Sequence, residues 1–293
     1  ALLATSIFGL NYTIAKELMP NILSPNALLY CRVLGAAVLF WFISFFLKWE
    51  KVEIKDFKLI FICSIFGMGL NMITALNGLY NSTPINGVII TTLAPIFIFL
   101  ISVIFIKEKI TKKKYLGVFI GFCGTLTLIL LNEKTVINAP NIKLGNFYFL
   151  INSVSYALYF VLVKPLTKKY NMITIMKWLF LFSIFINMPF GLIEFTKINW
   201  VEISGTSLLK VSYVVICTTF LVYLLNLYAL KNLKASTVGM FIYLQPVIGI
   251  LFAIYRGADK LTLADISSVL QNLYQLMLIL SLIHISEPTR PFH

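Results

Sequence analysis

The sequence has little charge and almost no histidine. Asp, Glu, Lys and Arg make up only 12% of its 293 residues, about half of the roughly 25% usual in soluble domains. Its two histidines, His284 and His293, lie at the C-terminal end, and no Asp or Glu lies at the centre of a long apolar run. These absences exclude an ordinary soluble fold, and they argue against a histidine-based metal site or paired catalytic acids inside a membrane.

The cysteines are too few and too scattered for a disulfide framework or a metal centre. Cys31, Cys63, Cys123 and Cys217 each lie within an apolar run, and no two of them have CxxC spacing. We interpret them as small packing residues. We therefore expect no cofactor, no bound metal and no enzyme activity.

Long apolar runs are what the sequence does contain. Hydrophobic residues make up 59% of the chain, and runs of about 18 or more residues, enough to cross a bilayer as a helix, recur throughout. The shorter alternating segments of a transmembrane barrel are missing. We predict an all-α polytopic membrane protein with ten transmembrane helices. They are expected at 1–16, 27–47, 58–80, 85–106, 115–131, 145–164, 173–194, 208–230, 237–255 and 263–283.

Lysines give the chain its net charge of +13. If the predicted helices alternate in direction, the loops on the N-terminal side carry fifteen lysines and the opposite loops carry seven Lys or Arg residues. The positive-inside bias then places the N-terminus in the cytoplasm. We interpret the charge as a property of cytoplasmic loops beside a lipid bilayer and not as a nucleic-acid surface. The abundance of Lys, Asn and Ile points to a bacterial inner membrane.

The second half of the chain repeats the first with an offset of about 150 residues. The aligned pairs are NSTPINGV at 81–88 with NLKASTVG at 232–239, LAPIF at 93–97 with LQPVI at 244–248, and SIFGLNYTIAK at 6–16 with VSYALYFVLVK at 154–164. Because each repeat holds an odd number of helices, the second must cross the membrane in the opposite direction. Inverted repeats are typical of secondary transporters, whose substrate site lies near the midplane between the halves.

Several short motifs stand out along the chain, some of them in both halves. They are FG…AK in the first predicted helix, a short turn before a helix with a central proline, the acidic residues Glu108 and Asp259, and KIT or KLT just after them. Together they resemble the EamA family of the drug/metabolite transporter superfamily. The resemblance implies two inverted five-helix halves, 1–131 and 145–283. It also implies a central cavity lined mainly by predicted helices 1, 3, 4, 6, 8 and 9, and transport of small metabolites, often outward.

The ends of the sequence depart from this pattern. Asp259 stands in a shifted setting, GADKLT, and the last predicted helix lacks the glycines of its counterpart, YLGVFIGFCGTLTLIL. The final residues resemble translated read-through of a sequencing adapter. We expect 266–293 not to be the native C-terminus, an expectation that resequencing the locus in the same frame would overturn. Because the chain opens without Met inside an apolar run, we also expect its first helix to lack a few residues.

The predicted helix interiors carry amides, hydroxyls and aromatic rings in place of acids. We predict a substrate site drawn from Asn11, Tyr12, Arg32, Asn71, Thr74, Asn77, Asn152, Ser155, Tyr159, Thr219, Tyr223, Asn226, Tyr243 and Gln245. Within this set Asn152, Ser155 and Tyr159 share one helix face, as do Thr219, Tyr223 and Asn226. Hydrogen bonding between helices is the alternative role for each buried amide. As a set, these groups suit a zwitterionic or hydroxylated metabolite, and Phe8, Tyr12 and Tyr156 could stack on a planar one.

Three basic residues within predicted spans have open roles. Arg32 lies about six residues, or ~9 Å, into its helix, so it could snorkel to the interface, pair structurally, or contact an anionic group of the substrate. Lys16 and Lys164 lie near helix ends, and we interpret them as interface anchors, with substrate binding as the alternative.

Two prolines fall inside predicted helices. Pro95 follows the helix-starting Pro84 by eleven residues, or roughly 16 Å, about half of a 30 Å hydrocarbon core. Pro95 cannot bond the Thr91 carbonyl, and Pro246 cannot bond the Ile242 carbonyl. We interpret the two kinks either as packing features or as a symmetric pair of hinges for alternating access.

Taken together, these patterns predict a secondary transporter. It would move small polar metabolites, amino acids or related compounds, by export or exchange across the bacterial inner membrane through alternating access. A non-transporting sensor or assembly partner on the same scaffold is the alternative. We expect a monomer or a homodimer.

Overall fold

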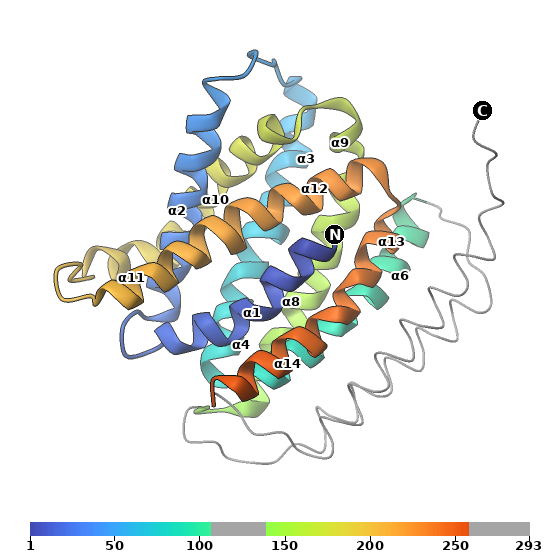
Figure 1. The fold of residues 1–293 in the computed structure, drawn as a ribbon. Coiled ribbons are helices and arrows are strands. Elements are labelled where there is room, and N and C mark those ends of the chain that lie inside the picture. Colours follow the sequence, from blue (N-terminus) through green and yellow to red (C-terminus); the bar gives the residue numbers. More distant parts are fainter. Residues whose placement is uncertain (107–138, 258–293) are drawn as a thin grey trace.

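The computed structural model describes residues 1–106 and 139–257, and these residues form a bundle of helices (Figure 1). The predicted helices at 115–131 and 263–283 lie outside the described residues, as do Glu108, Asp259, Cys123 and the tail at 266–293. The other eight predicted helices coincide with helical segments to within a few residues.

Three helices in the described part run without interruption, and a fourth ends in a short extension. These are α1 (Leu2–Leu18), α2 (Pro25–Ser44), α10 (Met172–Thr196) and α8 (Ile142–Leu162), which is followed by α9 (Lys164–Lys169).

Four further helical rods each contain an irregular turn in the middle. Two are joined by π-helical segments: α3 (Ile54–Ser64), Ile65–Leu70 and α4 (Asn71–Asn81); and α11 (Gly205–Ser212), Tyr213–Leu221 and α12 (Val222–Asn232). Two are joined by 3₁₀ segments: α5 (Pro84–Ile90), Thr91–Leu93 and α6 (Ala94–Ile106); and α13 (Ala235–Met240), Phe241–Leu244 and α14 (Gln245–Tyr255).

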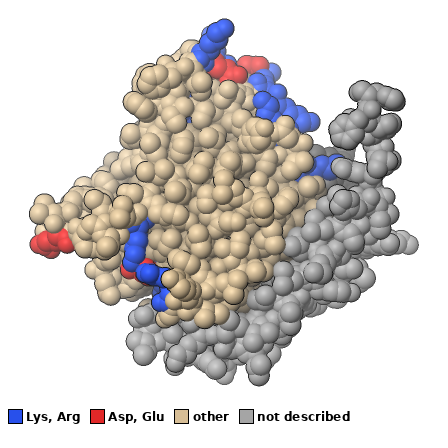
Figure 2. Space-filling model, viewed as in Figure 1, with Lys and Arg blue, Asp and Glu red and all other residues tan. Residues whose placement is uncertain are grey.

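The surface and the helix lengths both fit a bilayer. Seven helices in the described part are long and apolar enough to span a membrane. Helix α1, with 17 residues, is slightly shorter than these. Figure 2 shows a broad surface free of charge on the face in view, with charged side chains at its edges. The predicted class, an all-α polytopic membrane protein, is confirmed. The total of ten helices and their inverted arrangement stay predictions.

Side-chain caps fix where several helices begin. The Thr83 side chain accepts a hydrogen bond of 3.2 Å from the backbone N–H of Asn86, and Pro84 follows as the first helical residue of α5. This confirms the helix start predicted from NSTPIN. Ser24 and Pro25 begin α2 in the same way. Such caps satisfy backbone N–H groups that the first helical turn leaves free, and proline lacks the N–H that would otherwise need a partner.

Lys16 and Lys164 donate hydrogen bonds to carbonyls at the ends of two helices, α4 and α12. Lys16 Nζ donates to three carbonyls at the end of α4, those of Leu79, Tyr80 and Ser82, at 2.6–2.9 Å. Lys164 Nζ donates to the Leu233 carbonyl just after α12, at 2.6 Å. The last carbonyls of a helix have no intrahelical partner, and a lysine satisfies them well. Both lysines therefore bond carbonyls at helix ends, and their role as interface anchors stays a prediction.

Helix pairs distant in sequence build the core. The main pairs are α2 with α10, α4 with α8, and α1 with α14. The first of these pairs stacks Phe40 against Phe180, with ring centroids 5.3 Å apart. Because α1 and α14 come from opposite ends of the described chain, the interior of the bundle is built by both the N-terminal and the C-terminal part of the sequence.

Candidate functional site

The two proline breaks satisfy their own backbone hydrogen bonds. Thr91, which begins the first 3₁₀ turn, and Ile242, which lies within the second, are both buried. The carbonyl of Thr91, which Pro95 cannot bond, accepts from the N–H of Ala94 instead. The carbonyl of Ile242 likewise accepts from the N–H of Gln245. A tighter 3₁₀ turn is the local way to recover a bond that proline removes. Recovering the bond is important within a bilayer, because an unbonded carbonyl in the hydrocarbon core costs several kcal/mol.

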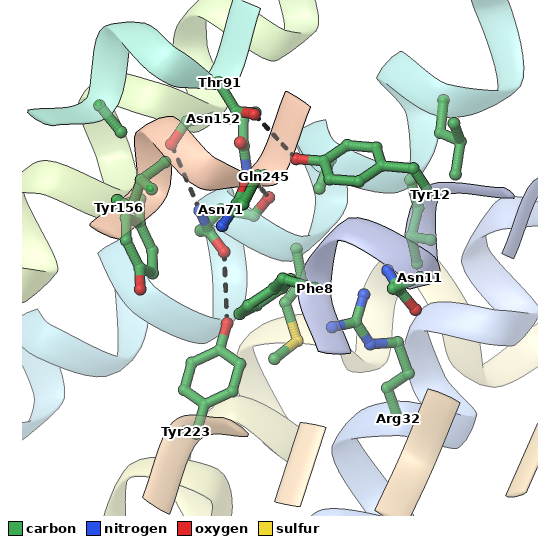
Figure 3. Close-up of a pocket in the computed structure, with 16 residues that line it drawn as sticks. Phe8, Asn11, Tyr12, Arg32, Asn71, Thr91, Asn152, Tyr156, Tyr223 and Gln245 are labelled. Atoms are coloured by element: carbon green, nitrogen blue, oxygen red, sulfur yellow. Dashed lines mark hydrogen bonds between the residues drawn. The ribbon is translucent and has the colours of Figure 1, made fainter. Parts of the chain in front are cut away.

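A cavity lies against both breaks. Its volume of about 60 Å³ is enough for about four water molecules, since one needs some 10–15 Å³ by the same measure. It is lined from α1 by Phe8, Asn11 and Tyr12; from α2 by Arg32; from α4 by Asn71, Met72, Ala75, Leu76 and Leu79; from the two proline-broken rods by Thr91, Ala94, Ile242 and Gln245; from α8 by Asn152 and Tyr156; and from α12 by Tyr223 (Figure 3).

One wall of the cavity is a hydrogen-bonded group that joins three helices. Asn152 Nδ2 donates to the backbone carbonyl of Asn71 at 2.8 Å, and Asn71 Nδ2 donates to that of Asn152 at 3.3 Å. The Tyr223 hydroxyl donates to Asn71 Oδ1 at 3.3 Å and to the Gly67 carbonyl at 3.1 Å. Asn71 thus links α4 to α8 and α12, as Figure 3 shows.

Two further hydrogen bonds hold hydroxyl groups at the cavity. The Tyr12 hydroxyl donates to Thr91 Oγ1 at 3.1 Å, which joins α1 to the first proline break. On α8, the Tyr156 hydroxyl accepts from Asn226 Nδ2 at 3.0 Å. A tyrosine hydroxyl that accepts a bond still has its own hydrogen to donate. Tyr156 therefore offers a donor to the cavity.

Arg32 is the charged group of the cavity. Its side chain is buried, at 3% exposure, so it does not snorkel to the bilayer surface. Its Nε donates to Thr219 Oγ1 at 2.9 Å, and Thr219 in turn donates to the Val214 carbonyl at 2.7 Å. No carboxylate among residues 1–106 and 139–257 forms an ion pair with it.

Half of the residues predicted for the site line this cavity. They are Asn11, Tyr12, Arg32, Asn71, Asn152, Tyr223 and Gln245. Thr219 and Asn226 lie behind the wall, bonded to Arg32 and Tyr156. Thr74, Asn77 and Ser155 donate to backbone carbonyls, and Tyr159 and Tyr243 are packed in the interior.

The predicted set left out several lining residues. Thr91 and Ile242 each stand four residues before a central proline. Both positions could have been found from the sequence, because each carries the backbone carbonyl that loses its partner at the proline. Phe8 and Tyr156 had been considered only as aromatic rings. The apolar lining of α4 carried no signal that separates it from packing residues.

Helices that are long and apolar enough to span a bilayer thus surround a cavity with amide, hydroxyl and guanidinium groups in its wall, which defines a polytopic membrane protein with a polar site in its interior. The profile of the EamA-like transporter family matches residues 1–130 and 143–281. The chain belongs to this family of membrane transporters.

Individual relatives agree with that assignment. An uncharacterized transporter of Archaeoglobus fulgidus is 29% identical over 90% of this chain and 91% of its own length. The uncharacterized transporter YyaM of Bacillus subtilis is 27% identical, with 92% and 89% covered. YetK of the same bacterium is 24% identical, with 85% and 76% covered. A solved crystal structure is similar in fold, with a TM-score of 0.69, 15% identity and 98% of both chains covered.

Proposed function

We propose that this protein is a secondary transporter that moves small polar metabolites, such as amino acids or related compounds, across the bacterial inner membrane by alternating access. The observation that carries the proposal is the buried cavity lined by amides, hydroxyls and one arginine from both family-matched segments. Polar groups buried in a membrane protein are costly unless they have partners, and they mark ligand pathways. Export and exchange are the expected modes.

The proposal includes an inverted arrangement of two five-helix halves with a cytoplasmic N-terminus. Paired irregularities support it: a π-helical segment and then a proline-linked 3₁₀ segment occur in each half, in the same order. The excess of lysines in the loops on the N-terminal side supports the orientation.

Transport itself is tested with purified protein in liposomes. We expect uptake or counterflow of at least one member of a panel of amino acids, small carboxylic acids and nucleotide metabolites, above that of empty liposomes. Empty liposomes taken through the same reconstitution steps control for leak through damaged bilayers. Folded protein that carries no member of the panel would instead support the non-transporting alternative.

The proline breaks are proposed as hinges of alternating access. Pro95→Ala and Pro246→Ala should each lower the transport rate by about tenfold, or about 1.4 kcal/mol on the barrier to reorientation, because a regular α-helix would replace the 3₁₀ turn beside the cavity. The amount of protein in the membrane should change little. Transport is measured per inserted molecule.

Pro189 supplies the matched control, because it lies inside the uninterrupted helix α10 and not beside either 3₁₀ segment. Pro189→Ala should transport at close to the wild-type rate. If Pro95→Ala and Pro246→Ala lower transport and insertion equally, or lower neither, the hinge role is wrong.

A further inference from the structure

The electrostatic balance of the cavity is unusual. Of the described residues that line it, Arg32 carries a formal charge and no acid is present to balance it. Thr219 occupies only the Nε of its guanidinium. The fork formed by the two terminal nitrogens therefore faces the cavity without a protein acceptor among the described residues.

A second group beside Arg32 lacks a partner. The Asn11 side chain lies next to the Arg32 guanidinium in Figure 3. It is buried, at 7% exposure, and its amide makes no hydrogen bond within the described part of the chain; Oδ1 is fully enclosed and unpaired. Buried amides in proteins normally have partners. The terminal nitrogens of Arg32 and Nδ2 of Asn11 are thus donors without a partner among the described residues, and the two side chains lie next to each other.

An unbalanced guanidinium in a low-dielectric site costs free energy until a counter-charge arrives. A carboxylate is the group that matches its planar fork, through two parallel hydrogen bonds. One arginine balances one negative charge, whereas a phosphate monoester carries about two at neutral pH. The apolar part of the lining, which includes Phe8, Met72 and Leu76, offers no anion to balance an ammonium group.

Resting on the transport function proposed above, we propose that the substrate is a small carboxylic acid bound as a monoanion, with its carboxylate between Arg32 and Asn11. The rest of the molecule lies against Phe8 and the apolar face of α4. Hydroxyl or keto oxygens of the substrate meet the Tyr156 hydroxyl and the Gln245 amide. The site therefore prefers a net anion over the zwitterion of the same carbon skeleton.

The test compares matched compounds on the purified full-length chain. Each set holds a 2-hydroxy acid of three to six carbons, its amide, the amino acid of the same skeleton, and a phosphate ester of similar size. We expect the hydroxy acids to raise the melting temperature and to exchange across liposomes. The neutral amides should do neither, and the amino acids and phosphate esters should bind at least about tenfold more weakly, about 1.4 kcal/mol.

Variants connect the effect to the proposed contacts. Arg32→Gln should remove the stabilisation by hydroxy acids, and Arg32→Lys, which keeps the charge and loses the fork, should retain part of it. Lys177→Gln is the matched control: Lys177 is also a buried cation, but it lies over the Trp49 ring at 4.2 Å and does not line the cavity. It should leave the stabilisation by hydroxy acids at the wild-type level.

The outcomes separate the two proposals. Equal transport of amides and acids, tighter binding of amino acids or phosphate esters, or unchanged acid binding by folded Arg32→Gln protein would overturn the anionic substrate and leave the transport function standing. If folded wild-type protein transports none of these compounds and none of the wider metabolite panel, both proposals fail.

Discussion

Gly145→Leu is expected to leave almost no folded protein in the membrane. A Cβ at this position would lie 2.6 Å from Ser82 Cβ, 2.7 Å from Ser82 N and 2.8 Å from the Gly78 carbonyl oxygen. Two of these atoms belong to the backbone, so no side-chain rotation relieves the clash. Overpacking in a well-packed core costs about 3 kcal/mol at the upper end of its usual range, and here it would separate α8 from α4.

The measurement is the melting temperature and the yield of monodisperse protein after detergent extraction. Gly205→Leu is the control, because a Cβ there meets nothing within 4 Å. Gly145→Ala should fall between the two. Equal yield and melting temperature for Gly145→Leu and Gly205→Leu would show that the two helices do not meet so closely.

Asn71→Leu is expected to lower transport by about tenfold while most of the protein still folds. The substitution removes the amide that bonds the Asn152 carbonyl and accepts from the Tyr223 hydroxyl. It also replaces a polar part of the cavity wall with an apolar one. A buried polar group left without its partner costs about 1–3 kcal/mol, and a loss of about 1.4 kcal/mol at the cavity corresponds to about tenfold in affinity.

A buried asparagine outside the cavity provides the comparison for Asn71. Asn187 donates to the Ser183 carbonyl at 2.8 Å and does not line the cavity. Asn187→Leu should therefore lower stability to a similar extent and keep transport per folded molecule. Comparable transport by both variants would place the substrate elsewhere.

The positions of spans, caps and breaks are predictable because they depend on neighbours in sequence. Apolar length sets a span, a Thr-Pro pair starts a helix, and a central proline removes one named bond. The helix start at Pro84 and the breaks before Pro95 and Pro246 all follow from such local rules.

Helix faces were predicted less well, for a geometric reason. The face through Thr219, Tyr223 and Asn226 assumed 3.6 residues per turn, yet Thr219 lies in the π-helical segment Tyr213–Leu221. A π-helical turn is wider, so residues on either side of it no longer keep the assumed angle. Of the three, only Tyr223 lines the cavity.

The sequence by itself determined the membrane class, the family and the kind of groups available to a site, since these rest on composition and local pattern. Only the tertiary structure decided which of those groups meet. Arg32 and Thr219 bond across 187 positions of sequence, and Ser155 turns to the Phe66 carbonyl while Asn152 lines the cavity. Such choices depend on which helix packs against each face, and packing between distant segments has no local signature.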